Sequence, residues 1–186
     1  MLEQKLKHAI CISGTADLDV CSEETKQKAF KIGKEIAKRD LILLTGATTG
    51  IPYLAAQGAK KAGGIVFGFS PAASKVSHLK TYHLPITYHD VIVYTGFGYS
   101  GRNLFLIRAA DGIIIINGRM GTLNEFTIAF EDKKPIGVLT GSGGTADKIE
   151  KIVKEAHRGP GKIVYDSNPS KLLDKLIKQI EEEEKL

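Results

Sequence analysis

Residues 113–125 read IIIINGRMGTLNE, and this stretch decides the fold that the sequence predicts. It runs from four consecutive isoleucines, through a turn that holds two glycines, into a segment with the pattern of an amphipathic helix. An uninterrupted apolar run of this length is typical of a strand that is covered on both faces, as in a parallel sheet. We therefore predict a buried strand, a turn and a helix, in that order.

The same alternation extends over the rest of the chain. Apolar runs predict strands at Ala9–Ser13, Leu41–Thr45, Ile65–Ser70, Val91–Thr95, Ile113–Ile116, Pro135–Thr140 and Lys162–Tyr165. Amphipathic segments predict helices at Glu23–Arg39, Pro52–Lys61, Arg102–Ala110, Leu123–Glu131, Ala146–His157 and Pro169–Glu184. Repeated strand–helix units with right-handed crossovers predict an α/β fold with three α/β/α layers and a mostly parallel sheet of about seven strands. Only residues 71–88 lack a sustained period, which indicates a long connection or a mobile flap.

Composition sets limits on the class of protein. A chain of 186 residues with 42% hydrophobic and 25% charged residues predicts a single globular domain over residues 1–186. Met1–Lys7 lacks the apolar core of a signal peptide, and no apolar stretch approaches the roughly 20 residues that span a bilayer. We therefore expect a cytoplasmic protein with no membrane partner. Cys11 and Cys21 form no metal-binding pattern, so neither a disulfide framework nor a metal site is predicted.

The formal net charge of +5 does not by itself identify a partner. The cations are dispersed and the chain ends in the acidic run Glu181–Glu184. A basic stripe with interleaved aromatic residues, which would favour nucleic acid, is not evident. A small phosphate-bearing ligand would also favour a positive local field, and we rank it above nucleic acid.

Three loops follow predicted strands and carry unusual residues. They are residues 45–50 (TGATTG), residues 96–103 (GFGYSGRN) and residues 117–125 (NGRMGTLNE). In an open parallel sheet, ligands bind beyond the carboxyl ends of the strands, close to a switch in strand order. Glycine-rich turns that lead into helix N-termini can bring backbone N–H groups to a phosphate. Residues 141–145 (GSGGT) also follow a strand, but we interpret them first as a turn.

Each loop alone is weak evidence, because every strand-to-helix junction needs a turn. Their joint placement predicts one pocket at the carboxyl edge of the sheet, to which Gly46, Gly118 and Arg102 all contribute. The full set of candidate phosphate- and nucleotide-binding residues is Gly14, Thr45, Gly46, Thr48, Thr49, Gly50, Asn103, Gly118, Arg119, Met120, Gly121 and Thr122.

The spacing of Arg102 and Glu125, with the segment Gly118-x-x-Gly121-Thr122-x-x-Glu125, resembles the cytokinin-activating phosphoribohydrolases called LOG. These enzymes, formerly described as lysine decarboxylases, belong to the SLOG superfamily of Rossmann-like nucleotide-binding proteins. That superfamily also includes DNA-processing protein A and the molybdenum cofactor carrier protein. The resemblance covers nearly the whole chain in element order, and only residues 102–125 carry specific motifs. It implies a Rossmann-like fold, catalytic roles for Arg102 and Glu125, a phosphate on the Gly118–Thr122 loop, and a dimer or a multiple of dimers.

The chain departs from the enzymes' pattern at several of these positions. Asn103 stands where they have lysine, Asn117 where they have proline, and Arg119 where they have the second glycine. The first loop also differs, because residues 45–50 lack the enzymes' three consecutive glycines. The fold inference survives these changes, whereas the identity of the substrate does not.

Several candidates have a purely structural alternative. Thr122 and Glu125 also fit a capping box, in which Glu125 would bond the backbone N–H of Thr122. Arg102 could be a first-turn arginine that serves a structural carboxylate, and Arg119 is equally a surface residue or a phosphate ligand. Tyr99 and Phe97 could stack on a base or simply pack. His78, His83 and His89 lack metal-ligand spacing, and we expect each of them to be exposed.

Three functions remain open from the sequence. The first is hydrolysis of the N-glycosidic bond of a purine nucleoside 5′-monophosphate, without cofactor or metal, in which Glu125 would stabilise an oxocarbenium-like transition state. The second is a non-catalytic carrier or sensor of a nucleotide or of the molybdenum cofactor, which accommodates the departures better. The third, nucleic-acid processing, ranks last.

Overall fold

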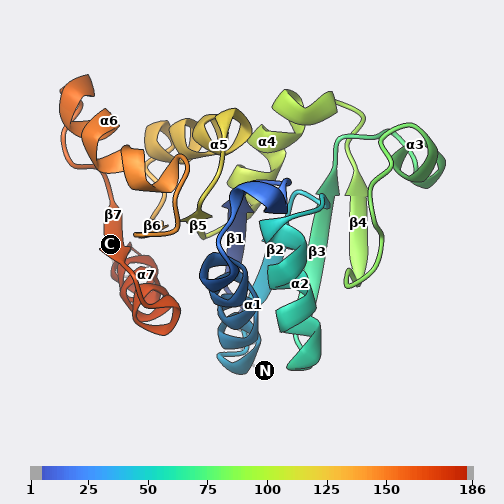
Figure 1. Ribbon diagram of the computed structural model, residues 1–186, viewed down its shortest axis with the longest axis horizontal. Coiled ribbons are helices and arrows are strands. Elements are labelled where there is room, and N and C mark those ends of the chain that lie inside the picture. The colour runs from blue at the N-terminus through green and yellow to red at the C-terminus, as the bar shows by residue number, and fades with distance from the viewer. Residues whose placement is uncertain (1–5, 184–186) are drawn as a thin grey trace, which may run out of the picture.

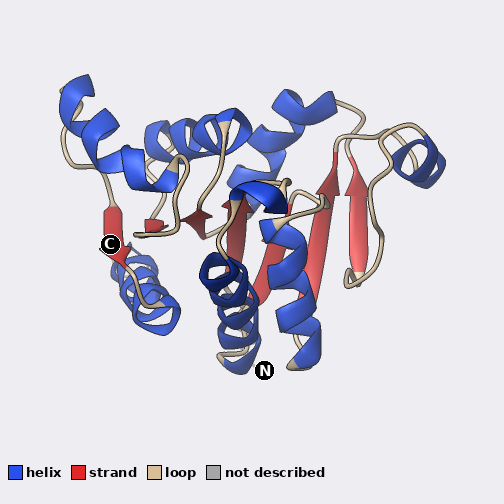
Figure 2. Ribbon diagram, viewed as in Figure 1, coloured by secondary structure: helices blue, strands red, loops and turns tan. Residues whose placement is uncertain are grey.

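A computed structural model describes residues 6–183 and contains a seven-stranded parallel sheet (Figures 1 and 2). The strand order is β4-β3-β2-β1-β5-β6-β7, and each neighbouring pair is parallel. The strands are β1 (Ala9–Gly14), β2 (Ile42–Thr45), β3 (Ile65–Ser70), β4 (Val91–Tyr94), β5 (Gly112–Ile116), β6 (Ile136–Leu139) and β7 (Ile163–Asp166). The predicted α/β class and the parallel sheet are confirmed.

Helices cover both faces of the sheet (Figure 1). One face packs against α1 (Glu23–Lys38), α2 (Ile51–Lys61) and α7 (Pro169–Glu183), and the other against α4 (Gly98–Ala109), α5 (Met120–Glu131) and α6 (Ile149–Ala156). Short helical turns occur at η1 (Leu18–Val20), α3 (Lys75–Lys80) and η2 (Ala146–Lys148).

The central strand β5 shows why the isoleucine run has no polar alternation. Ile114 and Ile116 belong to the core under α1, α2 and α7, whereas Ile113 and Ile115 belong to the core under α4 and α5. All four side chains are fully buried. Both faces of a strand in the middle of an α/β/α sandwich meet apolar helices, so successive side chains are all apolar.

The strand order reverses between β1 and β5, which pair directly from Ile10–Gly112 to Gly14–Ile116. From β1 the chain builds outward to β4 on one side, and from β5 it builds outward to β7 on the other. The two loops that leave the carboxyl ends of β1 and β5 therefore run to opposite faces and separate. Such a switch point is where open α/β sheets bind ligands.

Several predicted helix boundaries need correction. The helix predicted from Arg102 begins at Gly98, and the one predicted from Leu123 begins at Met120. Both errors have one cause: glycines near these starts were interpreted as loop, although the first turn of a helix tolerates weak helix formers because its N–H groups have no intrahelical acceptor anyway. The helix predicted over residues 146–157 divides into η2 and α6.

The irregular segment after β3 is anchored by a buried histidine, so the expectation that His78 is exposed was wrong. His78 is fully buried, with its Nδ1 2.8 Å from Ser70 Oγ and its Nε2 3.1 Å from the carbonyl oxygen of Pro85. These contacts tie the segment to the end of β3, where a polar side chain can be buried because both ring nitrogens have partners. His83 is exposed as predicted, whereas His89 is partly buried and lies 2.8 Å from Thr45 Oγ1. Burial lowers the pKa of His89.

Two further properties concern residues 6–183 as a whole. Within this range, no helix combines the length and the apolar character that a membrane span requires. The same range contains no group of three or more His, Cys, Asp or Glu side chains that could hold a metal ion. Most of the segment Met1–Lys7, from which we predicted the absence of a signal peptide, lies outside the described residues.

Candidate functional site

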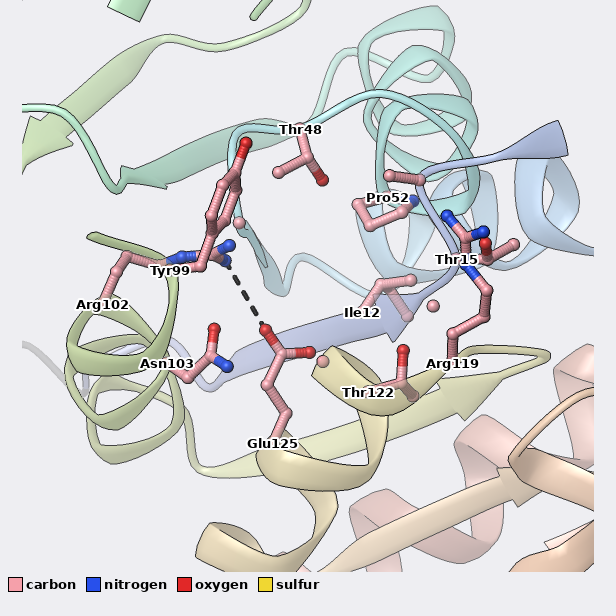
Figure 3. Close-up of a pocket in the computed structure, with 14 residues that line it drawn as sticks. Ile12, Thr15, Thr48, Pro52, Tyr99, Arg102, Asn103, Arg119, Thr122 and Glu125 are labelled. Carbon is pink, nitrogen blue, oxygen red and sulfur yellow. Dashed lines mark ion pairs between the residues drawn. The ribbon is translucent and has the colours of Figure 1, made fainter. Parts of the chain in front are cut away.

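A pocket opens at the carboxyl ends of β1, β2 and β5, where the strand order reverses (Figure 3). Its volume is about 200 Å³. The lining residues come from the end of β1, from the loops after β1, β2 and β5, and from α2, α4 and α5: Ile12, Gly14, Thr15, Ala16, Gly46, Thr48, Pro52, Tyr99, Arg102, Asn103, Arg119, Gly121, Thr122 and Glu125. Nine of the fourteen predicted site residues are in this set.

Arg102 and Glu125 form a buried ion pair in this pocket (Figure 3). Arg102 Nη1 lies 3.5 Å from Glu125 Oε1, and the two residues are only 4% and 8% exposed. Arg102 lies in the second turn of α4 and Glu125 in the second turn of α5, so neighbouring helices on one face of the sheet supply the pair. The fold therefore brings together Arg102 and Glu125, which are 23 positions apart in the sequence.

Glu125 has further polar partners. Ser13, near the end of β1, donates its hydroxyl to Glu125 Oε2. In the amide orientation that satisfies its neighbours, Asn103 donates to Glu125 Oε1 and to the backbone oxygen of Tyr99, each at 3.0 Å. Burial raises the pKa of Glu125, and the opposing effects of Arg102 and the Ser13 hydroxyl are smaller. The carboxyl group thus sits where its charge is costly and where three protein groups stabilise it.

Arg102 is not fully satisfied by the protein. Its Nε is buried and lacks a hydrogen-bond partner among residues 6–183. The guanidinium lies against Gly46, where an added Cβ would come within 1.9 Å of Arg102 Nη1. The absence of a side chain at Gly46 therefore leaves the space that the Arg102 guanidinium occupies. A buried guanidinium with an unused donor is a group that an anionic ligand can complete.

The N-terminus of α5 forms a second wall of the pocket. Gly121 and Thr122 lie in its first turn, and no side chain caps the helix at Arg119, the residue that precedes it. The capping-box alternative for Glu125 was wrong, because the helix begins at Met120 and Glu125 bonds Ser13 and Arg102 instead. Uncapped N–H groups and the positive end of the helix dipole favour an anion at this wall.

Arg119 extends from this helix start toward the loop after β1. Its Nη1 lies 3.3 Å from Asp17 Oδ2, and its side chain is 60% exposed. An exposed ion pair of this kind contributes little to stability, so the guanidinium can exchange one anionic partner for another at small cost. Met120, which we had also predicted as a site residue, is exposed and lies outside the pocket lining.

Most of the loop after β2, which we predicted to bind phosphate, contacts other parts of the protein instead. Thr45 contacts His89 and accepts from the backbone N–H of Ala47, and Thr49 donates to the backbone oxygen of Ala16. The N–H of Ile51, at the start of α2, donates to the carbonyl oxygen of Thr15. The segment therefore braces the loop after β1, with Gly50 packed against that loop, and only Gly46 and Thr48 line the pocket.

Gly118 stabilises the turn after β5 and is not among the residues that line the pocket. Its N–H donates to the side chain of Asn117, and its carbonyl oxygen accepts from Thr145. Its φ of +99° and the Thr122 side chain beside its Cα require glycine. Gly46 and Arg102 therefore line the pocket, whereas Gly118 lies at the same carboxyl edge, beside Thr122, and is not among the lining residues.

The loop of residues 141–145 supports this turn from outside. Ser142 accepts the N–H of Asn117 on its hydroxyl and the Asn117 side-chain amide on its carbonyl oxygen. Asp147 accepts from Gly141 and Gly143, which holds the loop itself. Asn117 can thus take a left-handed conformation, with φ of +54°, where the resembling enzymes have proline.

Sequence reasoning missed the contribution of the end of β1 and of the loop that follows it. Ile12, Thr15 and Ala16 line the pocket, and Ser13 bonds Glu125 from beneath. These residues could have been found from their position at the carboxyl end of the first predicted strand, where we predicted only Gly14 as a binding residue. Pro52 was interpreted as a helix start, and it lines the pocket as well.

Comparison with known proteins assigns the chain to a family. The model of the SLOG cluster4 family matches residues 7–173, nearly the whole described chain. The chain belongs to the SLOG cluster4 family. The predicted membership of the SLOG superfamily is thereby confirmed, whereas the closer resemblance to the LOG enzymes stays a prediction.

Three proteins similar to this SLOG cluster4 protein differ in their names and in how much of the chain they match. A molybdenum cofactor binding protein from Rippkaea orientalis has a TM-score of 0.77 at 26% identity, with 95% of this chain and 99% of that chain covered. DNA processing protein A from Helicobacter pylori has a TM-score of 0.63 at 19% identity, with coverages of 92% and 80%, and shows the fold alone. An uncharacterised protein of Archaeoglobus fulgidus is 29% identical over 119 residues, which are 64% of this chain and 73% of that protein.

Proposed function

We propose that this chain is a carrier or sensor that binds a nucleotide-type phosphate ester in the pocket between α4 and α5. The observation that carries the proposal is the buried Arg102, whose Nε lacks a partner among the described residues and whose guanidinium lines the same pocket as the uncapped start of α5. The similar structure of a molybdenum cofactor binding protein, at 26% identity, supports a small-molecule ligand over a polymer.

The phosphate is assigned to the α5 end of the pocket. Gly121 lacks a side chain and an added Cβ there would meet nothing within 4 Å, so a ligand can approach the helix start closely. Arg119 stands at the same end and can turn from Asp17 to the ligand. Backbone N–H groups, a helix dipole and a guanidinium together match a phosphate dianion.

A binding function accounts for the environment of Glu125 better than a catalytic one. Both of its carboxylate oxygens accept from protein groups, Oε2 from Ser13 and Oε1 from Asn103, and Oε1 also forms the ion pair with Arg102. A carboxylate held in this way orients Arg102, and both of its oxygens already have partners within the protein. Asn103, which stands where the resembling enzymes have lysine, is one of the groups that hold it.

Calorimetric titration with adenosine 5′-monophosphate and with adenosine tests the proposal. We expect the monophosphate to bind roughly 10- to 150-fold more tightly, which is the effect of one charge-assisted hydrogen bond of about 1.5–3 kcal/mol. Inorganic phosphate should compete with the monophosphate. Equal dissociation constants for nucleotide and nucleoside would contradict a phosphate site.

A second function, N-glycosidic hydrolysis, is favoured by the position of Glu125 among the lining residues, beside Arg102 (Figure 3). In that reaction water adds to the anomeric carbon, the bond to the base breaks, and the proton of the water goes to the departing base. Positive charge develops on the sugar, and a buried carboxylate would stabilise it.

Chromatography for free adenine after incubation with the monophosphate separates the two functions. The carrier function predicts that the ligand is recovered intact from the wild-type protein. Adenine release that is lost in Glu125→Gln and retained in Glu131→Gln, the same change at an exposed site on the same helix, would instead establish the hydrolase.

A further inference from the structure

The pocket has an aromatic wall that the phosphate site does not use. Tyr99, in the first turn of α4, lines the pocket, and its side chain is half exposed. In Figure 3 Tyr99 and Arg119 are drawn on opposite sides of the pocket, Glu125 lies between them, and the Arg102 guanidinium lies next to Tyr99. A large aromatic side chain left half open on a pocket wall is available for contact with a ligand.

The Tyr99 ring is held by its neighbours. Tyr82, from the segment after α3, meets it edge-to-face at a ring-centroid distance of 5.6 Å. The guanidinium carbon of Arg102 lies 6.0 Å from the Tyr99 ring centroid. The backbone oxygen of Tyr99 accepts a hydrogen bond from the Asn103 side chain. A ring fixed in this way loses little conformational freedom when a ligand stacks on it.

The other aromatic side chains at the start of α4 do not serve the pocket. Phe97 and Phe105 stack on each other, with ring centroids 5.2 Å apart and an interplanar angle of 14°, and neither is among the lining residues. Tyr99 is the aromatic residue among those that line the pocket. Substitution of Phe105, an aromatic residue of α4 outside the pocket lining, is therefore a control for substitution of Tyr99.

We infer that Tyr99 is the stacking platform for a planar heterocycle, so that the ligand carries an aromatic ring at one end and a phosphate at the other. This inference rests on the proposed phosphate site and adds the second half of the ligand. The sugar-like middle of such a ligand lies beside Glu125, whose carboxylate oxygens can accept from its hydroxyl groups. A simple sugar phosphate fills only the phosphate half of the pocket.

Titrations with adenosine 5′-monophosphate and ribose 5-phosphate test the inference, because the two ligands share the phosphate and the sugar. The wild-type protein should bind the nucleotide about 5- to 150-fold more tightly, the range expected for stacking of one base on an aromatic side chain. Tyr99→Ala should remove this preference and leave the affinity for ribose 5-phosphate unchanged. Tyr99→Phe and Phe105→Ala should both retain it.

The outcomes separate this inference from the proposed function. A Tyr99→Ala protein that keeps the preference, or that loses affinity for both ligands equally, overturns the stacking role while the phosphate site stands. Wild-type protein that binds ribose 5-phosphate and the nucleotide with equal affinity overturns it as well. Wild-type protein that binds neither ligand overturns the proposed function and the stacking role together.

Discussion

Arg102→Met should lower the free energy of unfolding by about 3–5 kcal/mol at pH 7, the usual cost of removing one partner of a buried ion pair. Methionine replaces the aliphatic part of the arginine side chain, so most of the cost comes from Glu125, which stays buried without its cation. Chemical denaturation with urea measures the change. Wild-type stability in the Arg102→Met protein would contradict the account of the pair.

The loss should depend on pH in a defined direction. Burial already raises the pKa of Glu125, and Arg102 partly opposes this effect, so removing Arg102 raises the pKa further. The folded state then binds a proton that the unfolded state releases, and stability falls as pH rises between the ordinary carboxyl pKa and the raised one. The deficit of the variant should therefore shrink as the pH is lowered from 7 toward 5.

A double variant separates the charge from the packing. In Arg102→Met with Glu125→Gln the buried carboxylate is absent, so most of the deficit and its pH dependence should disappear. The double variant also gives a measurement if Arg102→Met alone does not fold. A double variant as unstable as Arg102→Met would show that lost packing, and not the unpaired charge, dominates.

Gly121→Asp should weaken binding of a nucleoside monophosphate by about 100-fold or more. An added Cβ at Gly121 meets nothing within 4 Å, so the fold should accept the side chain. Two unit charges about 5 Å apart repel by about 3 kcal/mol at an effective dielectric constant of 20, and the phosphate is a dianion. An acidic residue in the first turn of α5 should meanwhile raise stability by about 0.3–1 kcal/mol.

The matched control is Gly121→Asn, which has the same shape without the charge. It should lose much less affinity than Gly121→Asp in the same calorimetric titration. Stability that rises while affinity falls would separate the ligand effect from any damage to the fold. Equal affinities for the Asp and Asn variants would place the phosphate away from the start of α5.

The fold could be predicted from the sequence because its strongest signals are local. The run Ile113–Ile116 has no polar residue, since both faces of β5 meet helices, and the same logic identified the other strands. The pairing of Arg102 with Glu125 was implied by the resemblance to the LOG enzymes, and the ion pair in the pocket agrees with it. Helix starts were less accurate, because glycines at the first turns of α4 and α5 resemble loop.

The errors within the site come from contacts between distant parts of the chain. Ser13 bonds Glu125 from 112 positions away, and a local capping box could not reveal that partner. The glycines after β2 signalled an open phosphate loop, yet the N–H of Ile51 is used by the carbonyl oxygen of Thr15. His78 was assigned to the surface because nothing in its neighbourhood indicates burial against Ser70. In each case a tertiary partner decided the role of a residue whose local pattern fitted another.

The most direct test of the phosphate site is a ¹H–¹⁵N NMR titration of the wild-type protein with adenosine 5′-monophosphate, with adenosine as the control. A phosphate at the start of α5 would perturb the amide signals of Gly121 and Thr122 first, because their N–H groups would donate to it. Adenosine should leave these two signals nearly unchanged. Perturbations that spare Gly121 and Thr122, or that are the same for nucleotide and nucleoside, would contradict a phosphate-binding pocket between α4 and α5.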